Sequence, residues 1–262
     1  LPKGIPYVLD VDDDYLELMI TKIQQEKSLW RKLRNRQILA LNRIFYERIL
    51  KRAKNLIWVK PQEISRNGTI LPNLPFQLLM SNKHELGPPS HSRILFIGKL
   101  SYPPNAEGIR WFLEEVWKSL CKSLPDLQLT IVSSVSPTGD LEDLISSSQG
   151  VRLKINLENV EDVYKEHSLS IVPVFFGGGS NIKVAEALIM GRKVICTPFG
   201  SRGFGKWRKT GLIHAVNTSQ EWTSKIQEIL IEKWDKKEFS NVWREFSLEN
   251  WNRQLIRILN EA

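Results

Sequence analysis

Short apolar segments alternate with helical patterns from about residue 92 to residue 240. Each segment has about five residues, which is typical of a buried strand. The predicted strands are 93–97, 127–131, 151–155, 170–174, 193–197 and 212–216. Helical spacing between them is clearest at Ile109, Phe112, Leu113, Val116, Trp117 and Leu120. Alternating strands and helices predict a doubly wound α/β domain whose parallel sheet is covered on both faces.

The remaining residues give a less regular pattern. Short strands are expected at 6–11, 56–59 and within 67–75, and helices at about 14–25, 28–54 and 241–260. The polar segment with Gly and Pro at 81–91 predicts a linker. The expected organisation is therefore a partial α/β domain over 1–80, the linker, an α/β domain over 92–240 and a C-terminal helical segment over 241–262.

Positive charge is concentrated in one stretch. The chain has 37 Lys and Arg against 29 Asp and Glu, a net charge of +8, and residues 27–60 alone hold eleven basic side chains and one acid. The expected helix there places apolar residues opposite the charges, and such a helix suits anionic lipid or nucleic acid, or it is a solvated surface. No nucleic-acid motif accompanies it, so nucleic acid is not expected as a partner.

Several chemistries are excluded by residue spacing. The two cysteines form no CxxC and the four histidines no HxxxH, which argues against a metal site and a disulfide framework. No cofactor or metal is therefore expected. Few cysteines, no targeting segment before Leu1 and no long apolar run favour the cytoplasm.

Two loops after predicted strands carry candidate binding chemistry. Gly177-Gly178-Gly179-Ser180-Asn181 precedes a helix that holds Lys183 and Glu186, and Gly98-Lys99 follows the first strand of the domain. Glycines allow close approach of a ligand, and a helix N-terminus favours phosphate. The alternatives are ordinary turns with an exposed Glu or Lys.

Two other motifs are interpreted as decoys. Residues 200–206 match GxxxxGK, but Trp207 stands where a P-loop needs Ser or Thr for Mg²⁺. Asp10-Val11-Asp12 matches the DxD pattern of metal-bound nucleotide sugars. The run Asp12 to Asp14 also suits a helix N-terminus, and we favour that capping role.

The stretch ILFIGKLSYPPNAEGIRWFLEEVW, then LQLTIV, then GVRLKINLENVEDVYKEHSLSIVPVFFGGGSNIKVAEALIMGRKVICTPFGSRGF resembles the donor half of family 4 glycosyltransferases with the GT-B fold. The likeness is dense over 93–205 and weaker elsewhere. It implies retaining transfer of a sugar from a nucleotide sugar to a glycan or lipid-linked acceptor.

The resemblance also implies roles for particular residues. Glu186 matches the second Glu of the E-x7-E motif, which contacts ribose hydroxyls, and Gly179, Ser180 and Asn181 match the loop whose amides meet the diphosphate or sugar. Lys99 matches a phosphate-neutralising residue, which makes a metal unnecessary.

Two positions depart from the pattern. Gly178 replaces the first Glu of E-x7-E, and Asn105 stands where the family has its second basic residue. Lys183 or Arg202 is a candidate to supply that missing charge. The predicted donor site is thus formed by Gly98, Lys99, Asn105, Gly178, Gly179, Ser180, Asn181, Lys183 and Glu186.

The same resemblance implies that residues 1–80 are expected to form only the last part of an acceptor domain, with acceptor-side catalytic residues expected upstream. The final helix is expected to cover the first domain, and the basic helix to meet an anionic membrane surface, peripherally at the inner face. Two alternatives share the fold: a nucleotide-sugar epimerase, and a truncated relative that binds only a sugar nucleotide or a partner.

Overall fold

The computed structural model describes residues 7–12, 15–26, 28–59, 68–75, 78–79, 87–89, 93–178 and 180–261. They form two compact units. One unit comprises residues 1–73, 176–180 and 247–262, and the other comprises residues 74–175 and 181–246. Most of the predicted linker, 81–91, lies outside the described residues.

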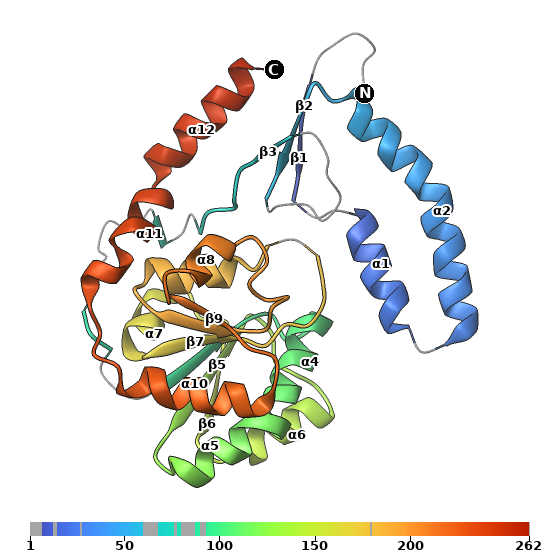
Figure 1. Cartoon of the computed structure of the whole chain (residues 1–262). Helices are drawn as coiled ribbons and strands as arrows, with labels where there is room; N and C mark the ends of the chain where they lie inside the picture. Colours follow the sequence, from blue (N-terminus) through green and yellow to red (C-terminus); the bar gives the residue numbers. More distant parts are fainter. Residues whose placement is uncertain are drawn as a thin grey trace. The chain divides into compact units, whose positions relative to one another are not determined.

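The larger unit is built on a six-stranded parallel sheet in the order β6-β5-β4-β7-β8-β9 (Figure 1). Its strands are β4 Arg93–Ile97, β5 Gln128–Ser133, β6 Val151–Ile155, β7 Leu169–Val172, β8 Lys193–Cys196 and β9 Ile213–Ala215. All six strands predicted from the sequence are present, within one or two residues of their predicted bounds. The order is that of a doubly wound dinucleotide-binding fold, with β4 and β7 as its central pair.

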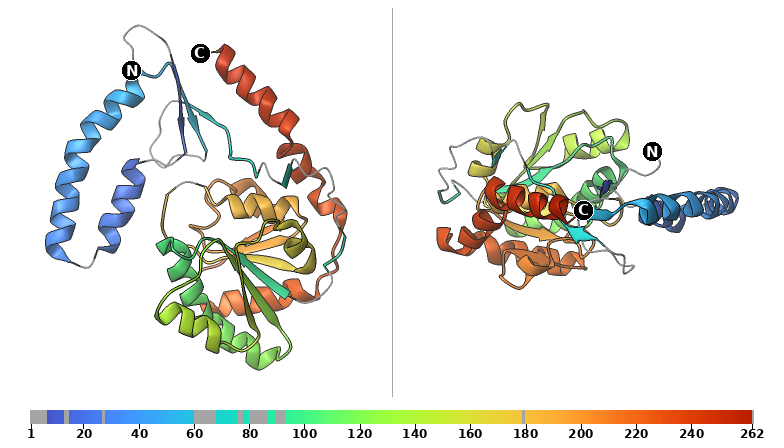
Figure 2. Two further views of the ribbon diagram at one scale, coloured as in Figure 1. Left: turned by 180° about the vertical axis from the view of Figure 1, so that it is seen from behind. Right: turned by 90° about the horizontal axis from the view of Figure 1, so that it is seen from above.

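Helices cover both faces of this sheet, as expected for buried parallel strands. Figures 1 and 2 show α4, α5, α6 and α10 on one face and α7 and α8 on the other. Their bounds are α4 Pro103–Trp111, α5 Lys118–Ser123, α6 Asp140–Ser147, α7 Glu161–Glu166, α8 Ile182–Ile189 and α10 Ser219–Ile231. Short helices elsewhere in its described residues are α9 Gly205–Arg208, the 3-10 turn η2 Lys236–Phe239 and α11 Ser240–Glu245.

The core of the larger unit lies between the sheet and the α4–α10 side. A π-helical segment, η1 Phe112–Trp117, joins α4 to α5, and its Phe112 ring packs edge-to-face on the buried Trp222 of α10. The predicted apolar face, Ile109 to Leu120, is buried throughout. A full capping box begins α10, because the Thr218 hydroxyl accepts from the Glu221 amide and the Glu221 carboxylate accepts from the Thr218 amide.

The smaller unit has a three-stranded parallel sheet in the order β1-β2-β3. Its strands are β1 Val8–Val11, β2 Asn55–Trp58 and β3 Thr69–Ile70, and its helices are α1 Tyr15–Gln25, α2 Leu29–Arg52 and α12 Leu248–Asn260. Ile258 of α12 packs with Ile57 and Leu71, and the Trp251 indole donates to the Pro72 carbonyl at 3.0 Å. These contacts join the C-terminal helix to the three-stranded sheet.

The single helix predicted over 241–260 is wrong. The chain forms α11 and α12 instead, and the Ser247 hydroxyl caps α12 by accepting from the Asn250 amide. Residues 241–246 belong to the larger unit because Val242 and Phe246 are buried there, and the Trp243 indole donates to the Ile189 carbonyl at 2.8 Å. The N-cap serine begins a new helix at this position.

The prediction that α2 separates apolar and basic faces is also wrong. α1 and α2 form a helical hairpin (Figure 2), in which the Asn42 amide donates to the Tyr15 hydroxyl at 2.7 Å. At 3.6 residues per turn, Arg34 falls on the same side of α2 as Leu41 and Phe45. Leu41 and Phe45 are 68% and 64% exposed, so α2 presents one mixed basic and apolar surface.

Candidate functional site

The carboxyl ends of β4 and β7 mark the point where the sheet reverses its strand order. Successive units of such a sheet wind outward from this point, and ligands of doubly wound folds bind in the crevice that it leaves. The loop after β4 begins at Gly98, and the segment after β7 leads into α8 at Ile182. The sequence-predicted residues of the larger unit cluster here.

Lys183 and Asn105 meet across this crevice. The Lys183 ammonium, in the first turn of α8, donates to Asn105 Oδ1 at 2.6 Å. Asn105 is buried in α4, and its amide nitrogen donates to the Lys99 carbonyl at 3.0 Å. Asn105 therefore links the loop after β4 to the cation on α8.

Gly98 packs closely against that cation. A Cβ atom at residue 98 would lie 2.9 Å from Lys183 Nζ and 2.9 Å from Asn105 Cγ. Real Cβ atoms do not approach other groups so closely without displacing them. The glycine thus makes room for the cation at the end of β4.

The environment of Lys183 disfavours its charge. Burial of the ammonium lowers the pKa of Lys183 to about 8, and Glu186 acts in the opposite direction. The ammonium also lies 5.2 Å from the centroid of the Phe96 ring, over its face. A cation held in this way gains more from a bound anion than an exposed lysine would, because it has already lost its water.

Glu186 lies three residues after Lys183 on α8, on the same side of the helix. Its Oε2 accepts a hydrogen bond from the hydroxyl of Tyr164 at 3.0 Å. Burial raises the pKa of Glu186, while the Tyr164 hydrogen bond and the Lys183 charge act against the rise. A carboxylate and a cation thus stand side by side at the reversal point.

The other residues of the predicted donor site differ in their exposure, their contacts and the unit to which they belong. Lys99 is exposed, and Asn181 donates from its amide to the Gly200 carbonyl at 3.0 Å. Gly178 and Ser180 lie in the segment 176–180, which belongs to the smaller unit. Gly179 lies outside the described residues. The structure therefore brings together Gly98, Asn105, Lys183 and Glu186.

Sequence reasoning missed Tyr164. It carries no motif, and the apolar spacing of its helix identifies it only as core. Its contact with Glu186 joins residues 22 positions apart, on two different helices. The only signal was a hydroxyl-bearing residue among buried positions, which normally finds a partner.

The two decoy motifs have local partners. Lys206 of the GxxxxGK match pairs with Glu245 of α11, and the helix that begins at its last glycine, α9, has four residues. Asp12 of the DxD match accepts from the Asn73 amide at 2.6 Å, while Asp13 and Asp14 lie outside the described residues. Arg202, the other candidate for the missing charge, stacks its guanidinium over the Phe199 ring.

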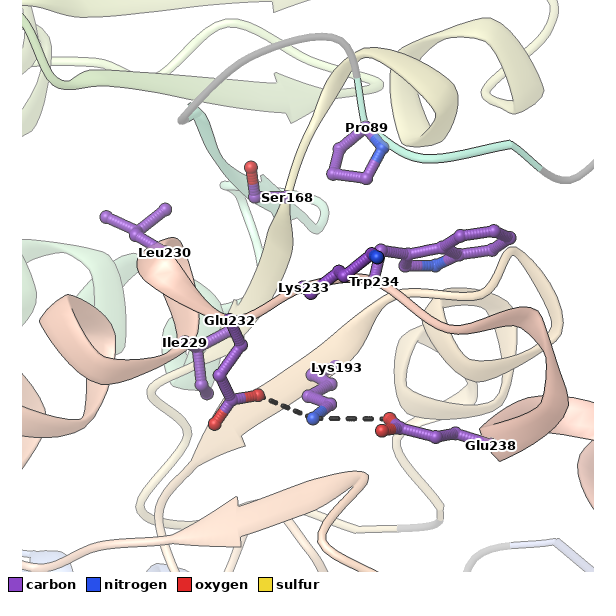
Figure 3. Close-up of a pocket in the computed structure, with 9 residues that line it drawn as sticks. All are labelled: Pro89, Ser168, Lys193, Ile229, Leu230, Glu232, Lys233, Trp234 and Glu238. Atoms are coloured by element: carbon purple, nitrogen blue, oxygen red, sulfur yellow. Dashed lines mark hydrogen bonds and ion pairs between the residues drawn. The ribbon is translucent and has the colours of Figure 1, made fainter.

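A second polar cluster lies at the opposite, amino-terminal edge of the sheet. The Lys193 ammonium, at the start of β8, contacts Glu232 Oε2 at 2.5 Å and Glu238 Oε2 at 3.2 Å (Figure 3). Burial opposes the charge, but the two hydrogen bonds outweigh it and raise the pKa of Lys193. The lysine joins the end of α10 and the η2 turn to the sheet.

Metal ligands do not gather within the described ranges: no three His, Cys, Asp or Glu side chains there could hold an ion together. Among the helices of the described residues, none is long and apolar enough to cross a bilayer.

Glycosyl transferases group 1 is the family that matches this chain, over residues 91–232, more than half of its length. The chain therefore belongs to the group 1 glycosyltransferase family, and the sequence-based prediction of that family is confirmed. A curated relative is an uncharacterized 44.6 kDa protein in the cps region of Klebsiella pneumoniae. The two sequences are 27% identical where they match, and the match covers 58% of this chain and 45% of the relative.

Two solved structures show the same fold. One is a mutant of S. aureus TarM in complex with fondaparinux, α-GlcNAc-glycerol and UDP. It superposes with a TM-score of 0.63 at 15% sequence identity, and the match covers 82% of this chain and 46% of the TarM chain. The other is a trehalose-6-phosphate synthase studied for glycosyl transfer with retention. Its TM-score is 0.57 at 11% sequence identity, and the match covers 83% of this chain and 64% of the synthase. These likenesses confirm the predicted GT-B-type α/β fold. The chain spans about half the length of TarM and of the curated relative.

Proposed function

We propose that this chain carries the donor-binding half of a glycosyltransferase, which moves a sugar from a nucleoside diphosphate sugar to a glycan or lipid-linked acceptor with retention. The observation that carries the proposal is that Lys183 and Glu186 lie on the same side of α8, at the reversal point of the sheet. Family membership and the UDP named in the TarM complex support it.

Lys183 would neutralise the diphosphate of the donor. Transfer of the sugar leaves a nucleoside diphosphate, and a fixed cation stabilises the charge that develops on it. Because Asn105 holds the ammonium in place, the cation needs little reorganisation during the reaction. We propose that Lys183, together with Lys99, performs this role in place of a metal ion.

Glu186 would accept hydrogen bonds from hydroxyl groups of the same ligand. In doubly wound folds an acidic side chain near the crevice typically binds ribose hydroxyls. Its place beside the cation allows one nucleotide to reach both groups.

Binding of nucleotides tests this function directly. UDP, GDP and ADP should be titrated calorimetrically into the wild-type chain and into Lys183→Gln. We expect one of the three to bind, and to bind at least tenfold more weakly to the variant, because a hydrogen-bonded charge on phosphate contributes more than about 1.4 kcal/mol. Lys209→Gln, at an exposed lysine, is the matched control. A folded wild-type chain that binds none of the three contradicts the proposal.

We also propose that the surface of α2 meets anionic lipid, at the inner face of the cytoplasmic membrane. Basic side chains and exposed Leu41, Ile44 and Phe45 share this helix, the combination that favours the membrane interface. Vesicles containing phosphatidylserine should sediment the chain at low salt and release it at high salt. Arg34→Glu with Arg48→Glu should abolish sedimentation, and equal sedimentation of the variant contradicts this assignment.

For the acceptor we expect a growing polysaccharide, because the Klebsiella relative lies in a cps region.

A further inference from the structure

Tyr164 is a buried residue of α7 that is fixed at two points. Its side chain has no exposed surface, and its hydroxyl donates to Glu186 Oε2 at 3.0 Å. Its backbone carbonyl accepts from Arg192 Nε at 2.8 Å, and Arg192 lies three residues beyond the end of α8. The phenol is therefore held by the same segment of chain that carries its carboxylate partner.

This contact leaves the two oxygens of Glu186 unequal. Oε2 is occupied by the phenol, while Oε1 accepts no hydrogen bond from any residue that the structure describes. A carboxylate has about four acceptor sites, so Oε1 remains able to accept from a ligand. The hydrogen bond from the phenol also restricts rotation of the carboxylate about the Cγ–Cδ bond. A glutamate side chain in water would rotate freely about that bond.

We propose that Tyr164 is a positioning residue that orients Glu186 so that its Oε1 accepts from the ribose hydroxyls of the nucleotide-sugar donor. This inference rests on the proposed function and assigns to it a residue that touches no substrate. The phenol has no other hydrogen-bond partner in the described residues, and a plain core position would be filled equally well by phenylalanine.

The hydroxyl contributes to binding only through the carboxylate. Loss of an oriented hydrogen bond to a charged group weakens an interaction by about tenfold. The loss should be confined to ligands whose hydroxyls use Glu186. A ligand that lacks these hydroxyls should bind Tyr164→Phe and the wild type alike.

The experiment compares ribonucleotides with deoxynucleotides. Whichever of UDP, GDP and ADP binds the wild-type chain is titrated calorimetrically together with its 2′-deoxy and 3′-deoxy forms, against the wild type, Tyr164→Phe and Tyr7→Phe. Tyr7 is the matched control, because among the described residues its hydroxyl donates to the Ile49 carbonyl, within the smaller unit. We expect Tyr164→Phe to lose about tenfold in ribonucleotide affinity and to keep its affinity for at least one deoxy form.

A double variant shows whether the effect passes through Glu186. Adding Tyr164→Phe to Glu186→Ala should cause no further loss of ribonucleotide affinity, because the carboxylate that the phenol orients is already absent. An equal loss in both backgrounds overturns the inference.

The remaining outcomes are distinct. If the wild type binds no nucleotide, the proposed function fails and this inference fails with it. If the wild type binds and Tyr164→Phe retains full ribonucleotide affinity, or loses ribonucleotide and both deoxy forms equally, only the role of Tyr164 is overturned.

Should Tyr164→Phe not fold, 3-fluorotyrosine at residue 164 replaces it, since it keeps the ring and is a stronger donor. Its preference for ribonucleotide over deoxynucleotide should then exceed that of the wild type, and an unchanged or smaller preference overturns the inference.

Discussion

The two units of this chain bury their helices in different ways. In the larger unit, the α4–η1–α5 segment places Ile109, Phe112 and Trp117 against the sheet with almost no exposed surface. In the smaller unit, α2 has 24 residues but buries only Asn35 and Leu50 among them. Helical spacing of apolar residues therefore predicts a helix in both units, yet it predicts a buried face only where a sheet lies beside it.

This contrast also separates two kinds of chemistry. The larger unit holds charged groups that are desolvated and individually positioned, such as Lys183 beside Asn105. The smaller unit offers an extended surface, where Arg34 and Phe45 are exposed together. Positioned groups suit a small ligand of defined shape, and an exposed mixed surface suits a large partner.

Two tryptophans give the largest expected difference between the units. Trp222 has no exposed surface, whereas Trp30 of α2 is 83% exposed. Trp222→Ala should lower the free energy of unfolding by about 3–5 kcal/mol, because it leaves a cavity in a packed core. Trp30→Ala should change it by less than about 0.5 kcal/mol. Urea unfolding followed by circular dichroism measures both, and similar values for the two variants would break the comparison.

Acidification should destabilise the larger unit through His167. Its Nε2 lies 2.7 Å from Thr130 Oγ1 and its Nδ1 contacts the Val163 carbonyl, and burial lowers the pKa of His167 from 6.5 to about 4. The folded state thus prefers neutral histidine, and its contribution to stability is lost as the pH falls from 6.5 toward 4, by up to about 3 kcal/mol.

The measurement is the urea midpoint of wild type and His167→Gln at pH 7 and pH 4.5. The variant should be less stable than the wild type at pH 7 and should lose less on acidification. An equal loss would assign the acid sensitivity to other groups.

Nucleotide affinity should fall in alkaline solution because of Lys183. Its pKa of about 8 in the free protein means that the ammonium loses its proton above that pH, and phosphate binds the charged form. We expect affinity for the bound nucleotide to fall by up to about tenfold per pH unit between pH 8 and 10. Calorimetry at pH 7, 8 and 9 measures this, and Lys183→Met should remove the dependence. A slope that persists in the variant contradicts the role of this lysine.

Helix caps give the smallest expected difference. The Thr218 hydroxyl accepts from the Glu221 amide at 3.2 Å in a full capping box, whereas the Ser28 hydroxyl accepts from the Arg31 amide at 3.5 Å. Thr218→Ala should lower the free energy of unfolding by about 1 kcal/mol, and Ser28→Ala by less than half of that. Urea unfolding again distinguishes them, and a larger effect of Ser28→Ala would contradict the ranking.

Much of the larger unit could be predicted because its strands are short apolar runs with helices between them. Ile94 and Phe96 are buried on a strand that the sequence marks at its observed bounds. The break at Ser247 does not follow from the spacing of Trp251 and Ile258, which fits one helix by itself. At 3.6 residues per turn, however, Val242 of α11 would lie on the opposite side of a continuous helix from Trp251. The mixed surface of α2 was mistaken for two faces because only the apolar positions were compared.

The candidate site was predictable only in part. Gly98 and Glu186 could be found from their places after strands and from the family likeness. The hydrogen bond between Lys183 and Asn105 joins residues 78 positions apart, and its existence depends on the strand order at β4 and β7. Loop position indicates where a ligand binds, while the pairing of side chains across the crevice requires the fold.

The contact between Lys183 and Asn105 also limits how this chain can evolve. A basic residue at position 105 would place a second positive charge at hydrogen-bond distance from the first, where burial already disfavours one charge. One positive charge can therefore be placed at position 105 or at position 183, but not at both. A lineage could move the cation from α8 to α4 only by losing it at position 183 first or at the same time, so the two positions should covary as a pair.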